Sequence, residues 1–189
     1  MTEQLFRVER HGDGGHVAEL VLDRPSAMNA VSTAMAEAIA AATGELGSDP
    51  QVRCVVLTSS HDRAFCVGAD LKERNALSDA EMVRQRPVSR SAYGGVLALP
   101  VPAIAAVDGF ALGGGFELAL SCDVIVAGEE ALVGLPEVSV GVIPGGGGTQ
   151  LLGRRVGWSR AARMTCHGSR GPYGASLLGR TSTPAARRL

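Results

Sequence analysis

Hydrophobic and polar positions along the first 130 residues follow two alternating patterns that predict an α/β fold. Residues 5–10 and 16–22 resemble the two strands of a hairpin, joined by a glycine-rich turn at residues 11–15. Segments with helical spacing come later and alternate with strand-like runs, so the order strand, loop, helix recurs along the chain. Short apolar runs that are typical of fully buried strands lie at residues 54–58 and 103–107, and a further strand is expected at residues 124–127.

Two of the predicted helices carry capping signals. Ser32 can cap a helix that the turn at residues 47–50 would end. Ser78 with Glu81 fits a capping box that opens a second helix. Pro87 lies inside this second segment, and we expect it to break or restart the helix because proline lacks the amide hydrogen.

The composition is that of one globular domain. The chain has 189 residues, of which 46% are apolar and 20% are charged, so it can bury a core. A net charge of −1 and an aromatic content of 4% exclude a broadly basic nucleic-acid binder that stacks bases on aromatic rings. The N-terminus lacks the apolar stretch of a signal peptide, and residues 94–107 are too short to span a bilayer. We therefore expect a cytoplasmic protein without a membrane segment.

Charge is distributed unevenly, and the last part of the chain differs in character from the rest. All 19 acidic residues lie within residues 1–137, whereas residues 138–189 hold eight arginines and no acid. Residues 158–164 still have the pattern of a helix, but no convincing period remains from residue 165 onward. The predicted organisation is a core of residues 1–164 and an irregular tail of residues 165–189. A nucleic-acid-binding arm is the alternative for this tail, although its arginines are scattered rather than clustered.

Cysteines and histidines show no spacing that is expected of a disulfide framework or a metal site. The four cysteines lie far apart, so we expect buried thiols in a reducing compartment; they are Cys54, Cys66, Cys122 and Cys166. Turn or surface positions suit the four histidines better than metal ligation. The sequence therefore predicts no metal site.

Two glycine-rich segments are candidates for chemistry. In FCVGAD, residues 65–70, Asp70 could cap a helix that starts at Leu71. Residues 113–115 are three glycines at the start of a predicted helix, where free amides point outward at the positive end of the helix dipole. Such donors suit a developing negative charge. The alternative for both segments is a tight turn that permits close packing, and the residues alone leave this choice open.

Two glutamates stand in apolar surroundings. Glu117 lies in GFELAL and Glu137 lies in VGLPEVSVG. A glutamate in such a setting costs free energy unless it is paired or used in chemistry. The alternative is one salt-bridged glutamate and one exposed loop glutamate, and periodicity cannot show whether the two meet in space.

Three motifs in this order resemble the enoyl-CoA hydratase/isomerase family, the crotonases. They are FCVGADLKE at residues 65–73, VPAIAAVDGFALGGGFELALSCDVIVAG at residues 101–128, and GLPEVSVGVIPGGGGTQLL at residues 134–152. The resemblance covers about residues 3–164. It implies a right-handed spiral of β-β-α units with two roughly perpendicular sheets, followed by C-terminal helices that build a homotrimer or a dimer of trimers.

The same resemblance implies roles for residues of these motifs. Ala69 and Gly114 would supply the two backbone amides of an oxyanion hole, and Glu117 and Glu137 would be the catalytic pair. Coenzyme A is part of the acyl-CoA substrate, so no separate cofactor is implied. The other substrate contacts, along the CoA path and in the acyl pocket, would come from Val67, Gly68, Asp70, Leu71, Gly113, Pro136 and Gly145.

A pair of glutamates favours hydration of a 2-enoyl thioester among the reactions of this family. Two preorganised amides would stabilise the enolate, Glu117 would activate the water, and Glu137 would deliver the proton to Cα. Like charges this close cannot both stay fully ionised, so the pair should titrate as a unit with one raised pKa. An isomerase or another crotonase-type reaction is the alternative activity.

The C-terminal segment departs from the family pattern. After Met164 the family continues into helices, whereas TCHGSRGPYGASLLGRTSTPAARRL has no acid and is rich in arginine, glycine and serine. Such a composition is typical of GC-rich coding sequence read out of frame, so we expect a frameshifted or truncated crotonase. A genuine short variant with a divergent tail is the alternative. Without these helices the trimer would lose its interface. The chain is therefore either an active enzyme or, as the alternative, an inactive remnant of one.

Overall fold

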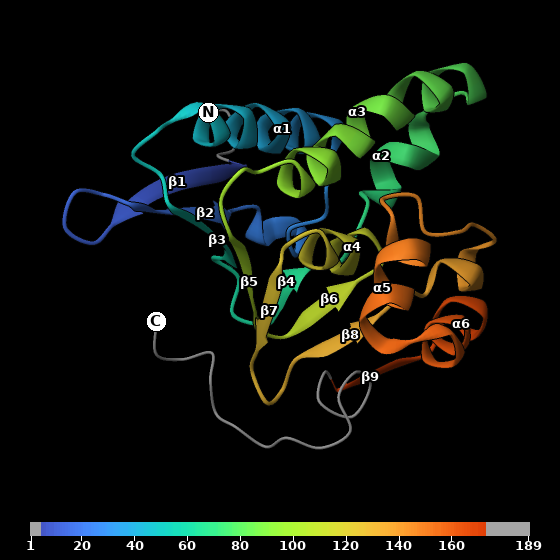
Figure 1. The fold of residues 1–189 in the computed structure, drawn as a ribbon. Coiled ribbons are helices and arrows are strands. Elements are labelled where there is room, and N and C mark those ends of the chain that lie inside the picture. Colours follow the sequence, from blue (N-terminus) through green and yellow to red (C-terminus); the bar gives the residue numbers. More distant parts are fainter. Residues whose placement is uncertain (1–4, 173–189) are drawn as a thin grey trace.

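The computed structural model describes residues 5–172, which form two β-sheets and the helices around them (Figure 1). The larger sheet has the order β1-β2-β3-β5-β7, and its strands are β1 (Phe6–His11), β2 (Val17–Leu22), β3 (Cys54–Ser59), β5 (Ala103–Val107) and β7 (Val124–Ala127). The smaller sheet has the order β4-β6-β8-β9, and its strands are β4 (Ala64–Cys66), β6 (Phe110–Leu112), β8 (Leu132–Gly134) and β9 (Arg170–Pro172).

From β3 to β8, consecutive strands alternate between the two sheets. Strands β3, β5 and β7 join the larger sheet, and the strand that follows each of them joins the smaller one. The pairings within these two series are parallel, whereas β1–β2 and β8–β9 are antiparallel. Because each turn of the chain contributes one strand to each sheet, the chain forms the spiral of β-β-α units that the resemblance predicts.

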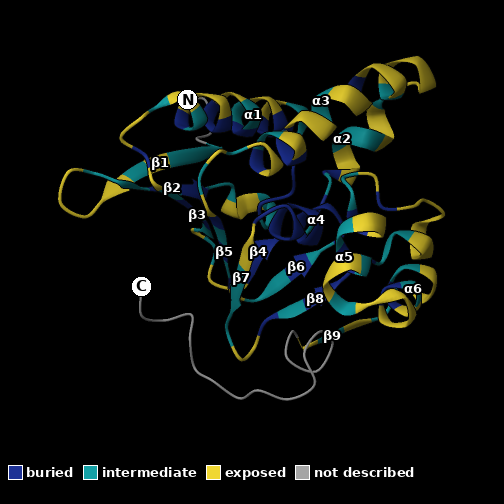
Figure 2. Ribbon diagram, in the orientation of Figure 1, coloured by how far each residue is buried: buried dark blue, intermediate teal, exposed yellow. Residues whose placement is uncertain are grey.

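Helices α1 and α3 lie side by side along one face of the larger sheet, while α5 and α6 lie beside the smaller sheet (Figure 1). The short helix α4 is buried along its whole length at the centre of the molecule (Figure 2). The helices are α1 (Thr33–Ser48), α2 (Leu71–Ala76), α3 (Asp79–Leu97), α4 (Gly114–Leu120), α5 (Gly148–Val156) and α6 (Trp158–His167), with 3-10 turns η1 (Pro25–Ala27) and η2 (Glu137–Val140).

The predicted capping residues lie where the sequence places them. The Ser32 hydroxyl accepts a hydrogen bond from the Met35 amide at 3.2 Å and caps α1. Ser78 and Glu81 form the expected capping box of α3. The predicted break at Pro87 is wrong, because α3 continues through this residue. Pro87 lies on the exposed side of the helix, where solvent can satisfy the carbonyl that loses its amide partner.

The apolar strands are buried on one face only, which corrects the prediction of fully buried strands. Burial alternates along β3 and β5, so that Val55, Leu57 and Ala105 face the helices and the core. The residues between them, such as Val56 and Ile104, are half-buried. Within residues 5–172 the helices cover only one face of the sheet, and the other face is open.

The hydrophobic pattern of the sequence does not predict the strands of the smaller sheet. Strands β4, β6 and β8 have three residues each, which is too short to show an alternation of apolar and polar positions. Residues 110–112, which the sequence pattern does not predict as a strand, pair with β4 and β8 as strand β6.

The prediction of an irregular segment from residue 165 is wrong for residues 165–172. Helix α6 continues to His167, and β9 pairs with β8, with Pro172 opposite Leu132. Backbone pairing to a sheet edge supplies the order that side-chain periodicity does not reveal. The remainder of the predicted tail, residues 173–189, lies outside the described residues.

Arginine from this basic part of the chain also has a structural role. Arg155 in α5 donates hydrogen bonds to the carbonyl of Leu120, the last residue of α4, and to those of Cys122 and Asp123 just beyond it. A cation that satisfies the last carbonyls of a helix stabilises the helix terminus.

All four cysteines are free, but only two are buried. Cys66 and Cys122 lie in the core, as predicted, whereas Cys54 is half-buried and Cys166 is exposed. Cys54 lies on the open face of the larger sheet and Cys166 on the outer side of α6, so the prediction of four buried thiols is wrong for these two. Within residues 5–172, the length and apolar character that a membrane span requires are not combined in any helix.

Candidate active site

The loop between β4 and α2 carries the first predicted motif and is fixed by backbone pairing to residues 28–31. The Val31 amide donates to the Gly68 carbonyl at 2.7 Å, and the Asp70 amide donates to the Val31 carbonyl at 3.0 Å. The Val67 amide donates to the carbonyl of Met28. The loop therefore has a defined backbone before any ligand binds.

Asp70 anchors this loop through its side chain. Its carboxylate caps α2 by accepting from the amides of Lys72 and Glu73, as the sequence predicts, and it pairs with Arg24 at 2.7 Å. Burial alone would raise the pKa of Asp70, but the Arg24 guanidinium and the capping amides outweigh it and hold the pKa below its ordinary value. The side chain is thus engaged within the protein.

Two amides converge beside Gly68. Gly68 has φ +99°, and a Cβ at this position would lie 2.9 Å from the Leu112 carbonyl oxygen and 3.2 Å from the Gly114 nitrogen. The Ala69 nitrogen is 3.6 Å from the place that a Cβ on Gly114 would occupy. Neither the Ala69 nor the Gly114 amide has an acceptor within residues 5–172. Glycine at position 68 allows the approach that gathers these two free donors.

Helix α4 begins at Gly114 and is held against the first loop. A Cβ on Gly115 would collide with the carbonyl of Cys66. The predicted alternative of a close packing turn is therefore true of Gly115, while Gly114 keeps a free amide. Every residue of α4 is buried, including Glu117, which is 3% exposed.

The Glu117 carboxylate is fixed by the glycine loop that precedes α5. Its Oε1 accepts hydrogen bonds from the amides of Gly146 and Gly148, both at 2.8 Å. Burial raises the pKa of Glu117, although these amides act in the opposite direction. One face of the carboxylate is held by fixed donors, as a positioned general base requires.

Glu137 is the first residue of η2 and lies against Gly113. Its Oε1 is 3.2 Å from the position of a Cβ on Gly113, and its Oε2 is buried without a hydrogen-bond partner in the described part of the chain. Burial and, to a lesser extent, the charge of Glu117 raise the pKa of Glu137 to about 7. The two carboxyl groups therefore share one electrostatic environment, as the sequence hypothesis requires.

The other predicted contact residues surround this centre. Val67 and Pro136 are half-buried next to Gly68 and Glu137, and Gly145 is exposed at the start of the glycine loop. Leu71 is 55% exposed on the first turn of α2, away from the core.

Sequence reasoning missed three residues that shape the site. Gly146 and Gly148 hold Glu117 through their amides, and the run of four glycines at residues 145–148 could have identified them. Tyr93 in α3 reaches the site from a helix without a motif, and a Cβ on Gly114 would lie 2.5 Å from its hydroxyl oxygen. No local pattern could have identified Tyr93.

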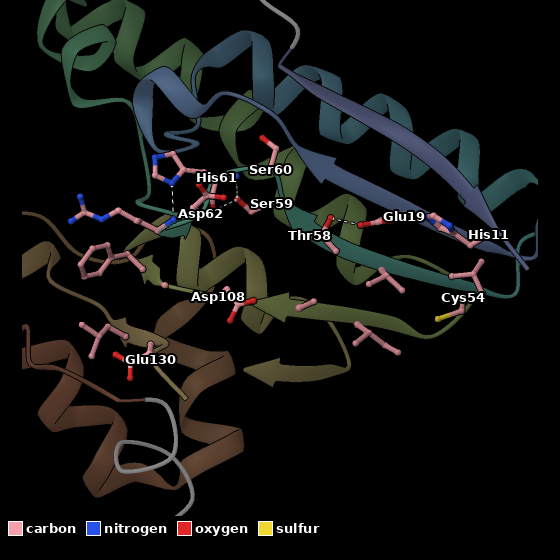
Figure 3. A pocket seen from close by; sticks show the side chains of 18 residues that line it. His11, Glu19, Cys54, Thr58, Ser59, Ser60, His61, Asp62, Asp108 and Glu130 are labelled. Atoms are coloured by element: carbon pink, nitrogen blue, oxygen red, sulfur yellow. Dashed lines mark hydrogen bonds and ion pairs between the residues drawn. The ribbon is translucent and has the colours of Figure 1, made fainter. Parts of the chain in front are cut away.

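A groove of about 1190 Å³ lies elsewhere, on the open face of the larger sheet (Figure 3). Its lining includes Glu19, Thr58, Asp108 and Glu130, and it contains none of the predicted site residues. The carboxylate pair is therefore a separate site.

At one end of this groove, strand pairing places Glu9 opposite Glu19 with His11 beside them. One possible metal-ligand atom from each of the three lies within 4.8 Å of the others, a grouping that linear spacing does not reveal. Each carboxylate already has a protein partner: Arg7 pairs with Glu9 at 2.6 Å and Thr58 donates to Glu19 at 2.8 Å.

Comparison with known proteins places this arrangement in a family. The sequence profile of the enoyl-CoA hydratase/isomerase family matches residues 12–175. Bovine mitochondrial enoyl-CoA hydratase domain-containing protein 2 is 43% identical over 159 residues, which is 84% of this chain and 54% of that protein. Mouse mitochondrial methylglutaconyl-CoA hydratase is 43% identical over 165 residues, which is 86% of this chain and 52% of that protein.

Among solved structures, an enoyl-CoA hydratase from Bacillus anthracis superimposes with a TM-score of 0.87 at 36% identity, covering 92% of this chain and 66% of that chain. The chain thus spans about half the length of the two curated relatives. The range matched by the family profile, residues 12–175, spans both glutamates and both glycine-rich segments. The sequence, the spiral of β-β-α units and these comparisons together show that the chain belongs to the enoyl-CoA hydratase/isomerase family.

Proposed function

We propose that the chain carries the catalytic centre of an enoyl-CoA hydratase, which adds water across the 2,3 double bond of an enoyl-CoA thioester. The observation that carries this proposal is the meeting of two kinds of group. Two free amides, of Ala69 and Gly114, lie beside two carboxyl groups with raised pKa, that of the buried Glu117 and that of the half-buried Glu137.

The amides act on the thioester. Addition of water at C3 moves negative charge to the thioester oxygen, and the Ala69 and Gly114 amides would donate hydrogen bonds to that oxygen. Because their positions are fixed before the reaction, the donors need no reorganisation as the charge develops. Loss of one such donor typically lowers the rate by about 10²–10³-fold.

The carboxyl groups act on the water and the α-carbon. Glu117, held by the Gly146 and Gly148 amides, would orient the water and take its proton as the oxygen attacks C3. Glu137 would deliver a proton to C2, and its pKa of about 7 leaves a protonated fraction available near neutral pH. The bare Oε2 of Glu137 suits this transfer, since no protein group competes for it within the described residues.

An isomerase is the second candidate. Moving a double bond requires one group to carry a proton between two carbons, and Glu137 with its free oxygen could do so alone. The strict positioning of Glu117 favours hydration, because an isomerase needs no oriented water. Incubation with crotonyl-CoA and with a 3-enoyl-CoA separates the two reactions.

The test uses the purified chain. Crotonyl-CoA hydration is followed by the loss of absorbance of the conjugated enoyl thioester, and the product is identified by mass. Gly114→Val should abolish turnover because the side chain would meet the Tyr93 hydroxyl, whereas Gly94→Ala, on an open helix surface, should not. Absence of hydration by a folded, CoA-binding wild-type protein would refute the proposed function.

The assembly of the chain also remains a proposal. The resemblance implies a trimer, and exposed apolar side chains beside Glu137 favour association with another surface: Val138, Val140, Val142 and Ile143. Sedimentation of the same sample used for the assay would determine whether activity accompanies an oligomer.

A further inference from the structure

Tyr93 is a buried polar side chain that the mechanism above does not use. It is 7% exposed and projects from α3 toward the start of α4. No residue within residues 5–172 makes a hydrogen bond to its hydroxyl. The hydroxyl oxygen is not among the side-chain oxygens that the protein encloses without a partner, so a ligand can reach it.

The position of the hydroxyl indicates what that ligand is. A Cβ on Gly114 would lie 2.5 Å from the Tyr93 oxygen and 3.6 Å from the Ala69 nitrogen. The hydroxyl and the Ala69 amide nitrogen are therefore no farther apart than the sum of these distances, and one point beside Gly114 is close to both. Three hydrogen-bond donors without protein acceptors thus surround one point beside Gly114.

The ring fixes this placement. A Cβ on Gly146 would lie 2.8 Å from the Cδ2 and Cε2 atoms of Tyr93, so the ring packs directly on the loop that holds Glu117. The ring therefore spans from the amide donors to the support of the general base. These contacts leave the ring little freedom, and the hydroxyl is preorganised.

The surroundings keep the hydroxyl protonated. Burial raises the pKa of Tyr93, and Glu117, Cys66 and Glu137 raise it further, while Arg74 acts in the opposite direction. The group is therefore a donor at neutral pH.

We propose that the Tyr93 hydroxyl is a third hydrogen-bond donor to the thioester oxygen, completing an oxyanion hole of two amides and one phenol. This inference deepens the proposed function, on which it rests, because the oxygen that it binds is the one that becomes negative during hydration. The three donors would act together, and the hydroxyl would strengthen its hydrogen bond as the enolate forms.

The test is Tyr93→Phe, which keeps the ring against Gly146 and removes only the hydroxyl. Ser91→Ala is the matched control, since it removes a hydroxyl from the exposed side of the same helix. We expect Tyr93→Phe to lower kcat for crotonyl-CoA by about 10–100-fold with little change in KM. The control should keep wild-type kinetics.

A binding measurement makes the test independent of turnover. Acetoacetyl-CoA presents an enolate oxygen, whereas butyryl-CoA presents a neutral thioester, and titration calorimetry gives Kd for both. Tyr93→Phe should weaken acetoacetyl-CoA by about tenfold or more and butyryl-CoA by less than about threefold. Thermal unfolding of the variant should match the wild type within about 2 °C.

The outcomes separate the two proposals. Equal weakening of both ligands, or unchanged kcat and unchanged Kd values, would show that Tyr93 has only a packing role. A wild-type chain that does not hydrate crotonyl-CoA but prefers acetoacetyl-CoA in a Tyr93-dependent way would refute the hydratase and retain the third donor. A wild-type chain that binds neither thioester would overturn both.

Discussion

The two glutamate-bearing regions of the site differ in how the protein supports them. Glu117 lies in α4, whose seven residues are all buried, and its carboxylate is held by two amides (Figure 2). Glu137 lies in η2, which has no buried residue, and the segment that follows exposes Val142 and Ile143. The carboxyl group of Glu117 is thus fixed within the core, and that of Glu137 lies at the edge of the core.

In the proposed mechanism, this difference suits the two carboxyl groups to different tasks. A base that orients water gains from rigid donors and dense packing, which only the core provides. A group that delivers a proton needs a raised pKa and a free oxygen, and both are found at the edge of the core. The apolar residues near Glu137 are exposed at this edge, whereas α4 is enclosed by the core.

The largest effect on the buried region around Glu117 should come from added side-chain volume between α4 and the loop that it contacts. Gly115→Val places its side chain against the Cys66 carbonyl, and we expect a loss of about 4 kcal/mol or more in the free energy of unfolding, or no folded protein at all. Gly94→Ala, with open space around it, should change stability by less than about 1 kcal/mol. Urea unfolding of both variants checks this, and a stable Gly115→Val protein would contradict the packing described.

Removing the carboxylates one at a time should show that the two regions act as a unit. Glu117→Gln and Glu137→Gln should each lower kcat for hydration by about 10²–10⁴-fold. The double variant should lose far less than the product of the two, because neither half of the reaction proceeds without the other. Full activity in either single variant would exclude the paired mechanism, and unchanged CoA affinity would serve as the control for folding.

The raised pKa of Glu137 predicts a pH dependence. A folded-state pKa of about 7 against an ordinary value of 4.5 means that the folded chain holds the proton more tightly. Its stabilising contribution is complete below about pH 4.5 and is lost as the pH rises through about 7. Because the group is only half-buried, we expect a decline of about 1 kcal/mol between pH 5 and 8. Glu137→Gln should remove that decline in urea unfolding.

In the wild-type chain, the hydration rate should fall above about pH 7 as Glu137 loses the proton that it delivers. If the free energy of unfolding of Glu137→Gln declined with pH as much as that of the wild type, another group would be responsible for the effect on stability.

The smallest effect on stability should come from the exposed apolar residues that follow Glu137. Val142 and Ile143 are 51% and 79% exposed, so replacing both with serine should alter the free energy of unfolding by less than about 0.5 kcal/mol. The same double variant should lower the fraction of associated protein in sedimentation, because it removes apolar surface. Leu118→Ala, in the fully buried half, should instead cost about 2–5 kcal/mol. Unchanged association would mean that this surface is not an interface.

Local features were predictable because their physics is local. Ser32, Asp70 and Ser78 cap their helices with amides two or three residues away, so their roles follow from adjacent sequence. Pro87 was misjudged because its cost depends on whether solvent reaches the abandoned carbonyl, and that depends on which side of α3 faces outward.

Pairing between distant segments was not predictable from periodicity. Strands of three residues have no period to detect, and β9 is ordered by its pairing with β8 rather than by its own composition. The Tyr93 hydroxyl meets Gly114 only because α3 packs beside the start of α4, and nothing near position 93 in the sequence announces it.

The sequence by itself determined the family resemblance, the α/β order, the helix caps and the residues that carry charge into apolar surroundings. These are properties of single residues and their near neighbours, which the chain retains before it folds. Only the tertiary structure decided that the Ala69 and Gly114 amides converge, that glycine amides hold Glu117, and that Glu137 lies at the edge of the core. Each of these depends on side-chain volume and backbone approach between segments more than 20 residues apart, which packing settles and linear order does not.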